Sequence, residues 1–505
     1  MLRHKNSKQI ELYEFKHPFE TELDLENRWV KLSQLLPWEE LIKIYSKSLS
    51  RDKGRYGIDG RLAVGSMIIK HRLNLSDREV IETLQENIYL QYFVGFHRFK
   101  KEKAFDASLF VHLRKRLGLE AFDEMTQKII TISEEQKERS TVKKRSNQKP
   151  EDKSQGNDNK AKTNKGKLKI DATVTDQMIE YPTDHTLLNK AREESQRIID
   201  ILYKQTELEK KPRTYRKKAR KDYLSFSKKR QKSRKVVHKA VGKQLRYLRR
   251  NIGHIHNLLD LFAGKEFPLN QKDQKIFWVI QELYSQQAEM YSRNKHSVKD
   301  RIVNIYQPYV RPIPRGKAKS KTEFGAKIGV SLAGGFSRVN KLSWDAYSES
   351  KDLKKQVKDY KELYNYYPEV VLADKVYLTR ENRSWLKEQG IRVTGTPPGR
   401  PKKDISYYEK AKKRKEHRER NHIEGKFGQG KNAYGLNKIR ARRQDTAESW
   451  IAAIFFIMNL INYQKLRTIF SLSFFTDWKK VKYFISEMIA AFIYKYKFNI
   501  RLASS

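Results

Sequence analysis

Apolar residues recur at helical spacing through roughly the first 135 residues of the chain, with few Gly or Pro between them. Ser76-Asp77-Arg78-Glu79 has the form of a capping box and predicts that a helix begins there. A second helix is predicted over 107–116, with a basic outer face that includes Arg114 and Lys115. We therefore expect an all-helical N-terminal domain over 1–138, either a plain helical bundle or a helix-turn-helix reader of DNA.

The helical pattern disappears over 139–167, where almost no apolar side chains occur among many Lys, Asn, Gly and Ser. Such a segment cannot bury enough surface to order itself, so it predicts a basic disordered linker. Alternating apolar residues from Leu168 onward then predict a strand that carries Asp171.

Helical periodicity returns over about 187–300 and is strongly basic. Between Lys210 and Arg250, nineteen Lys or Arg stand against one acid, Asp222. A charge run usually marks a solvated face, but this density exceeds what solubility requires, and it favours contact with a phosphate backbone. The candidate contacts in this basic helical insertion are Arg216, Lys217, Lys218, Arg220, Lys228, Lys229 and Arg230.

Further strand patterns follow the insertion. A hairpin is predicted over 322–344 with Gly334-Gly335 as its turn, and 369–374 has the character of a buried strand that ends in an acid. A helix is expected over 380–389 and a short strand over 391–396, closed by Pro397-Pro398-Gly399. Together these elements predict a mixed α+β protein whose sheet is interrupted by the helical insertion.

The longest apolar run, 451–461, is about half of the roughly 20 residues that span a bilayer. It predicts a buried helix and no membrane partner. The residues from 464 to 505 are aromatic and basic, and we expect a helical C-terminal tail there. The N-terminus lacks the apolar core of a signal peptide, so secretion is not expected.

Charge points to the partner. The 505 residues include 107 Lys or Arg against 60 Asp or Glu, a formal net charge of +47, and such self-repulsion favours a polyanion as a bound partner. A ribosomal or packaging protein would share the charge but is usually shorter. The absence of Cys excludes a disulfide framework and a thiolate zinc site, and it is compatible with the cytosol.

Three acids occupy matching positions: Asp171 inside a strand, Asp374 at the end of another strand, and Glu424 on a helix after the sheet. Three convergent carboxylates can hold two divalent cations about 3.5–4 Å apart, and Mg²⁺ or Mn²⁺ suits such oxygen ligands. Each acid alone has a plainer explanation, as a turn cap or as an ion-pair partner. Asp176, Glu180 and Asp184 are less favoured as ligands, and Asp184 is predicted to cap the helix that follows.

The stretch around Glu424 is basic. Arg420, Glu424 and Lys431 fall on one helical face, which suits a metal ion beside phosphate, whereas a solvated, salt-bridged face is the alternative. Gly425, Gly428 and Gly430 each disfavour a helix by about 1 kcal/mol relative to Ala, so we expect the helix to loosen beyond Glu424.

The three acids lie in the segments 170–193, 371–386 and 420–436. These segments resemble the three blocks of bacterial DDE transposases, most closely the insertion-sequence-five family. The resemblance extends over most of the chain up to about Tyr463. It implies an RNase H-like catalytic domain over 168–463 in which Asp171, Asp374 and Glu424 bind two metal ions, and it implies cleavage and joining of DNA at terminal inverted repeats.

Related transposases also share a motif of Tyr, Arg, Glu and Lys, which here reads His417, Arg420, Glu424 and Lys431, with His in place of Tyr. The resemblance implies that these basic residues hold the DNA end, that transposon ends and target DNA are the partners, that the active complex is a homodimer, and that the protein works at the nucleoid in the bacterial cytoplasm. A metal-dependent nuclease without joining activity and a non-catalytic DNA-binding protein remain the alternatives.

Overall fold

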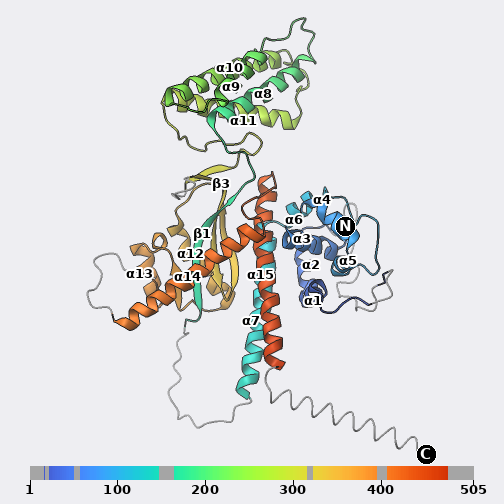
Figure 1. Cartoon of the computed structure of the whole chain (residues 1–505), viewed down its shortest axis with the longest axis vertical. Helices are drawn as coiled ribbons and strands as arrows, with labels where there is room; N and C mark the ends of the chain where they lie inside the picture. The colour runs from blue at the N-terminus through green and yellow to red at the C-terminus, as the bar shows by residue number, and fades with distance from the viewer. Residues whose placement is uncertain are drawn as a thin grey trace, which may run out of the picture.

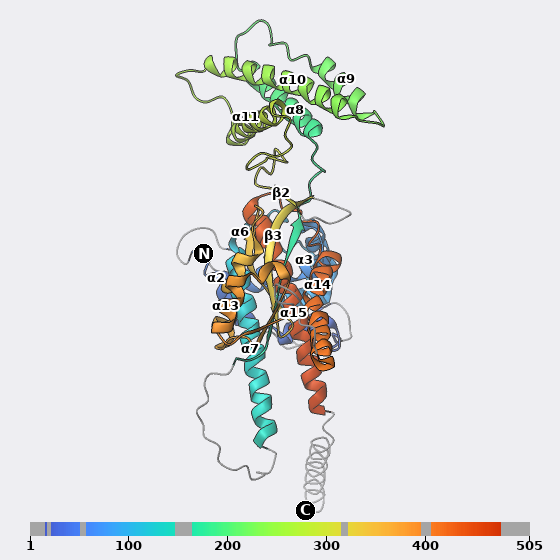
Figure 2. The ribbon, with the colours of Figure 1, turned by 90° about the vertical axis from the view of Figure 1, so that its left-hand side faces the viewer.

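The computed structural model describes residues 16–17, 22–50, 57–146, 164–314, 322–394 and 406–475. Within these ranges the chain forms a set of N-terminal helices, a mixed sheet with helices on both faces, and a helical unit at one end (Figures 1 and 2). The predicted α+β class is thus present, with many more helices than strands.

The N-terminal helices begin and end close to where the periodicity predicts. Ser76 and Glu79 form the reciprocal bonds of a capping box, which confirms that prediction. The last helix of the group continues to Ser146, so the linker prediction is wrong for 139–146, and 147–163 lie outside the described residues. The helices are α1 (Arg28–Leu35), α2 (Trp38–Ser46), α3 (Gly60–Leu73), α4 (Asp77–Glu86), α5 (Ile88–Phe93), α6 (Leu109–Arg116) and α7 (Leu119–Ser146).

The sheet has six strands. Five of them follow the order β2-β3-β1-β5-β6, and the sixth, β4, lies off this path and also pairs with β3. β1 runs antiparallel to β3 and parallel to β5, and β6 is parallel to β5. Gly334 and Gly335 have φ values of 57° and 87° in the turn between β3 and β4, so the predicted hairpin is confirmed. The strands are β1 (Lys167–Asp176), β2 (Arg311–Pro314), β3 (Thr322–Ala333), β4 (Phe336–Ser343), β5 (Val370–Ala373) and β6 (Arg392–Val393).

Two layers of helices cover the sheet. Leu168 and Ile170 of β1 pack with apolar residues of α12 and α13 on one face. Ile328 and Val330 of β3 pack with α14 and α15 on the other. The predicted strand over 391–396 is shorter than expected, and Pro397-Pro398-Gly399 lies outside the described residues. The elements after β4 that complete these layers are η2 (Glu349–Asp352), α12 (Leu353–Tyr364), η3 (Lys375–Tyr377), α13 (Arg380–Glu388), α14 (Tyr407–Ala433) and α15 (Gln444–Phe475).

Helix α15 joins the sheet to the N-terminal helices. Its residues 451–460 are all buried, so the buried helix predicted for this apolar run is confirmed. They belong to one apolar cluster that also includes residues of α3, α6, α7 and β4. Asn459 fixes the register, because its side chain accepts from the Ser337 amide (2.8 Å) and donates to the Ser337 carbonyl (2.6 Å). None of the described helices is long and apolar enough to cross a membrane.

The basic insertion is a helical unit with its own apolar core, formed by α8 (Asp184–Tyr203), α9 (Arg216–Ser227), α10 (Arg234–Asp260) and α11 (Gln271–Ser292). It stands at the end of the molecule beyond β2 and β3 (Figure 2). The prediction that Asp184 caps this unit's first helix is wrong. Thr183 is the cap, accepting from the Thr186 amide, while Asp184 pairs with Arg301 at 2.6 Å.

Candidate active site

Asp171 and Asp374 come at corresponding points of two neighbouring strands, each one residue after the last paired position. The parallel pairing of β1 with β5 joins Ile170 to Ala373, the last residue of β5. Asp171 is the next residue of β1, and Asp374 directly follows the last residue of β5. This is the end of parallel strands at which acids from different segments can meet.

The Asp171 carboxyl is mostly buried, and its Oδ1 accepts from the Ala172 amide at 2.8 Å. Burial raises its pKa from 3.8 to about 6, against the opposing effects of that backbone bond and of the Arg420 charge. The negative charges of Glu349 and Glu424 raise the pKa further. The exposed Asp374 accepts from the Lys375 amide at 2.8 Å and caps the short η3 turn.

Helix α14 lies across β1 and β5 (Figure 1). Two ion pairs hold it there: Lys167 Nζ at the start of β1 lies 2.7 Å from Glu419 Oε2, and Arg392 of β6 pairs with Glu416. Ile423 of this helix is fully buried. These contacts fix α14 beside β1 and bring Glu424 within electrostatic reach of Asp171.

Glu424 is bound by its own helix. Arg420 Nη2 donates to Glu424 Oε1 at 3.1 Å, with the Arg420 side chain 17% exposed and the Glu424 side chain 54% exposed. The salt-bridged face that was the alternative interpretation is therefore present in the structure without ligands. Because the Arg420 and Glu424 charges both act on Asp171, the pair nevertheless lies within electrostatic reach of the first acid.

The expectation that α14 loosens beyond Glu424 is wrong, because the helix continues to Ala433. At Gly430 an added Cβ would lie 3.0 Å from Leu436 and 3.4 Å from the Met458 sulfur of α15. Close packing of α14 on α15 at this point outweighs the low helix propensity of glycine. Lys431 is consequently helical, seven residues beyond Glu424, while His417 is exposed seven residues before it.

The donor chemistry of the three acids fits a hard divalent cation, because carboxylate oxygens are the ligands that Mg²⁺ prefers. Their side chains are not arranged as a metal site: in the part of the chain that the structure describes, no three His, Cys, Asp or Glu residues are placed to hold an ion. Glu424 would have to leave Arg420 to join a shared ion.

Two residues beside these acids were not identified from the sequence. Glu349 of η2 pairs with Lys327 of β3 at 2.8 Å, and its charge acts on Asp171. Tyr377 is fully buried three residues after Asp374, and its hydroxyl has no hydrogen-bond partner among the residues that the structure describes. Burial raises its pKa, and the charges of Glu349 and Asp171 add to this effect. No periodicity or spacing distinguishes these two residues in the sequence, because they meet the site only through the fold.

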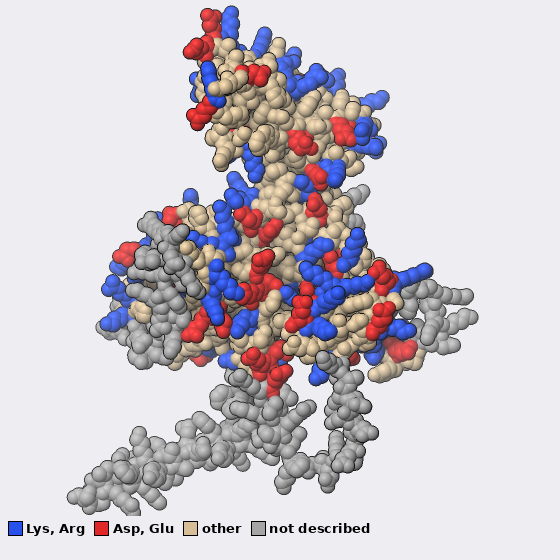
Figure 3. All heavy atoms as spheres, turned by 180° about the vertical axis from the view of Figure 1, so that it is seen from behind, with Lys and Arg blue, Asp and Glu red and all other residues tan. Residues whose placement is uncertain are grey.

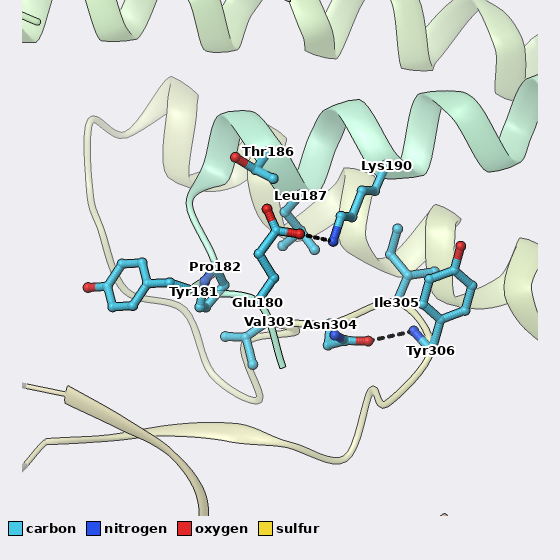
Figure 4. A pocket seen from close by; sticks show the side chains of 10 residues that line it. All are labelled: Glu180, Tyr181, Pro182, Thr186, Leu187, Lys190, Val303, Asn304, Ile305 and Tyr306. Atoms are coloured by element: carbon cyan, nitrogen blue, oxygen red, sulfur yellow. Dashed lines mark hydrogen bonds and ion pairs between the residues drawn. The ribbon is translucent and has the colours of Figure 1, made fainter. Parts of the chain in front are cut away.

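Glu180, one of the less favoured acids, lies where the chain passes from the sheet to the insertion. It pairs with Lys190 there, beside Tyr181 and Pro182 (Figure 4). The two segments that connect the sheet with the insertion, 180–190 and 303–306, enclose a small hollow. Figure 4 shows side chains from both segments around it. It is lined by Glu180, Tyr181, Pro182, Thr186, Leu187, Lys190, Val303, Asn304, Ile305 and Tyr306.

The basic residues of the insertion are mostly exposed, and Lys and Arg gather along its outer edge when the molecule is seen from behind (Figure 3). Arg216 is already engaged, since its Nη2 lies 2.9 Å from both oxygens of Asp200. The other candidate contacts in α9 and the following loop are exposed: Lys217, Lys218, Arg220, Lys228, Lys229 and Arg230.

Arg114 does not lie on the predicted basic outer face of α6. Its side chain is only 5% exposed, and its two terminal nitrogens each lie 2.8 Å from an oxygen of Asp77. Lys70 shares the same carboxylate at 2.9 Å. The prediction that Arg114 contacts DNA is therefore wrong, whereas Lys115 is exposed and available.

Comparison with known proteins identifies the class. Residues 17–116 match the family described as "Transposase domain", and residues 371–461, which include Asp374 and Glu424, match the family described as "Transposase DDE domain". An uncharacterized protein from Rhizobium meliloti, ORF8 in the nfe locus, is 30% identical over 162 residues, which cover 32% of this chain and 68% of that protein. No solved structure matches the chain.

The protein belongs to the DDE transposases of insertion sequences. Asp171 and the basic insertion fall between the two matched segments, so their roles rest on the structure and on the resemblance of the first block. Membership of the insertion-sequence-five group stays a prediction.

Proposed function

We propose that this transposase cleaves DNA at the terminal inverted repeats of an insertion sequence and joins the freed 3′ ends to target DNA, using an RNase H-like catalytic domain. The observation that supports the proposal is the parallel pairing of β1 with β5, which ends one residue before Asp171 and Asp374, together with the charges of Arg420 and Glu424 that act on Asp171. These acids come from three separate segments, and we infer that they act together beside the basic helix α14.

Asp171, Asp374 and Glu424 would together hold two Mg²⁺ or Mn²⁺ ions. When bound, such ions activate the attacking oxygen and stabilise the leaving oxygen of a phosphodiester. Asp171 must be ionised to serve as a ligand, and its raised pKa means that it loses its proton near pH 6. Its neighbour Ala172 keeps one carboxylate oxygen oriented through the backbone bond.

Arg420 and Lys431 would hold phosphates of the DNA end. Once Glu424 turns to the metal, the Arg420 guanidinium is released and can bind phosphate oxygens in a fork, whereas Lys431 acts as a point charge. His417 takes the place of the family's Tyr on the same side of α14 and is a further candidate contact.

The partners would be double-stranded transposon ends and target DNA, held by a homodimer at the nucleoid in the bacterial cytoplasm. Phosphate contacts by the basic insertion, and by Lys115 of the N-terminal helices, would supply affinity without choosing sequence. The assignment of 1–138 as a DNA-binding domain and of 464–505 as a tail belongs to the same proposal.

The test is cleavage of a duplex that carries the terminal repeat flanking the gene, with Mg²⁺. Asp171→Asn should abolish cleavage and leave DNA binding intact. Cleavage at the wild-type rate in this variant contradicts the catalytic assignment and favours a non-catalytic DNA-binding role for these acids. Pre-cleaved ends with 3′ hydroxyls then separate the two enzymatic candidates, because a nuclease without joining activity yields no strand-transfer product.

A further inference from the structure

The first half of α14 stands free of the rest of the described structure. Residues 407–415 are all exposed, whereas Ile423 and Phe427 in the second half are buried. The helix begins at the Ser406 cap, whose hydroxyl accepts from the Glu409 amide. α14 is therefore one continuous helix that packs at the active site and projects beyond the sheet (Figure 1).

A row of cations runs along this helix on the same side as Glu424. At 100° per residue, Lys413 and His417 lie within about 20° of Glu424 around the helix axis, and Lys410 and Arg420 lie within about 40°. Lys410, Lys413 and His417 are exposed. The described residues offer neither lysine an ion-pair partner. The row is continuous with the face that carries the third acid.

Because α14 is held firmly against the sheet, the distance between the lysines of this row and the candidate active site is fixed. The ion pairs of Glu416 with Arg392 and of Glu419 with Lys167 clamp α14 to the sheet at the point where the free half begins. At 1.5 Å per residue, Lys410 lies about 21 Å along the helix from Glu424. One DNA strand carries a phosphate about every 3.4 Å of duplex axis, so this length corresponds to about six phosphates.

We propose that Lys410 and Lys413 form a phosphate-binding rail for the DNA end, contacting the backbone up to about six nucleotides from the phosphate that is cut. The occupant is duplex DNA, because Lys410 and Lys413 are positively charged and lead directly to the acids that would act on a phosphodiester. The rail rests on the proposed function, and it adds a surface outside the motif that runs from His417 to Lys431.

The chain offers a matched control on the opposite side. Lys415 lies about 180° from Glu424 and Lys412 about 120°, and both are exposed on the same free segment. The variants Lys410→Gln/Lys413→Gln and Lys412→Gln/Lys415→Gln therefore remove equal charge from different faces of one helix, and Lys415 also acts on the charge of Glu419. Circular dichroism of both variants shows whether the fold is retained.

Binding to a terminal-repeat duplex is measured as a function of salt, in the Asp171→Asn background so that no cleavage occurs. Loss of two phosphate contacts should reduce the slope of log affinity against log salt by about 1.8 for Lys410→Gln/Lys413→Gln, with no change for the control pair. Equal losses in both pairs would show a diffuse charge effect and overturn the rail.

Neutral methylphosphonates placed one at a time around the cleavage position locate the contacts. In the protein with both lysines intact, substitutions within about six nucleotides should weaken binding, and Lys410→Gln/Lys413→Gln should be insensitive at those positions only. If the same methylphosphonate positions weaken binding in Lys410→Gln/Lys413→Gln as in the protein with both lysines, the rail is overturned. Failure of the wild-type protein to cleave or join would instead contradict the proposed function while leaving this map interpretable.

Discussion

Arg420 donates to Glu424 at 3.1 Å across one turn of α14. The residue assigned to phosphate thus neutralises the residue assigned to metal. Metal binding at Glu424 and phosphate binding at Arg420 each break this bond, so each should favour the other. An exposed ion pair contributes about 1 kcal/mol or less, so the coupling is modest and easily reversed.

Arg420→Gln should therefore strengthen Mn²⁺ binding in the absence of DNA by up to about fivefold, because Glu424 no longer has a competing partner. The same variant should weaken binding to the DNA end. Isothermal titration with Mn²⁺ measures the first effect, and Arg418→Gln serves as the control that changes charge on the same helix. Weaker Mn²⁺ binding by Arg420→Gln would contradict the proposed competition.

Lys431→Ala should weaken binding to the DNA end more than it weakens metal binding. Lys431 lies on the Glu424 side of α14, about two turns further along, where it can reach a phosphate but has no oxygen to offer a metal. Parallel titrations with terminal-repeat duplex and with Mn²⁺ separate the two effects. A loss confined to the metal titration would contradict the role given to this lysine.

Asp171→Asn should stabilise the metal-free protein at pH 7.5. A carboxyl whose pKa rises from 3.8 in the unfolded chain to about 6 in the native state binds more protons when folded, so stability falls as pH rises through this window. Above pH 6 the full penalty applies, up to about 3 kcal/mol, and Asn removes it.

Thermal unfolding at pH 7.5 and at pH 4.5 measures this difference. The gain should be present at the higher pH and mostly absent at the lower, where Asp171 is largely protonated. Asp374→Asn is the matched control at an exposed acid and should show no gain. A gain of equal size at both pH values would mean that the ionisation of Asp171 is not its cause.

Arg114→Met should destabilise the protein by about 3–5 kcal/mol, since it leaves Asp77 with only Lys70 inside the N-terminal helices. Lys115→Met, one residue further on, should change stability little because that side chain is exposed. Denaturant titration compares the two. Similar stabilities, with a loss of DNA affinity in Arg114→Met, would restore Arg114 as a surface contact.

Replacing the six exposed cations of the insertion by Gln should flatten the salt dependence of DNA binding, by at most about 5 in the log–log slope. Deleting 210–250 is a poorer test, because Leu245 and Leu248 of α10 lie in the insertion's core and the whole unit would unfold. Gel-shift titrations at several salt concentrations give the slope. An unaltered slope would remove the insertion as the main phosphate contact. The residues replaced are Lys217, Lys218, Arg220, Lys228, Lys229 and Arg230.

Short-range patterns were sufficient to predict most elements of the sheet. Alternation predicted β1 with Asp171, and the glycine pair predicted the β3–β4 turn. Errors arose where distant residues decide the outcome. Arg114 was assigned to the surface because its partner Asp77 is 37 residues away, outside the reach of helical periodicity.

The candidate site shows the same limit. Three acids were identifiable from their blocks, but the pairing of β1 with β5 that leads to Asp171 and Asp374 is a register that no local pattern specifies. The bond between Arg420 and Glu424 was anticipated as the plainer alternative. Glu349 was missed because it reaches Asp171 through η2, a segment with no distinguishing spacing.

The central position of α15 has a consequence for synthesis. The N-terminal helices emerge from the ribosome first, but the apolar surface that they share with this helix stays uncovered until residues 444–475 have been made. Any polypeptide that stops before α15 exposes that surface and lacks the helix that connects the N-terminal helices to the sheet. Assembly of the shared core therefore requires that α15 has been synthesised.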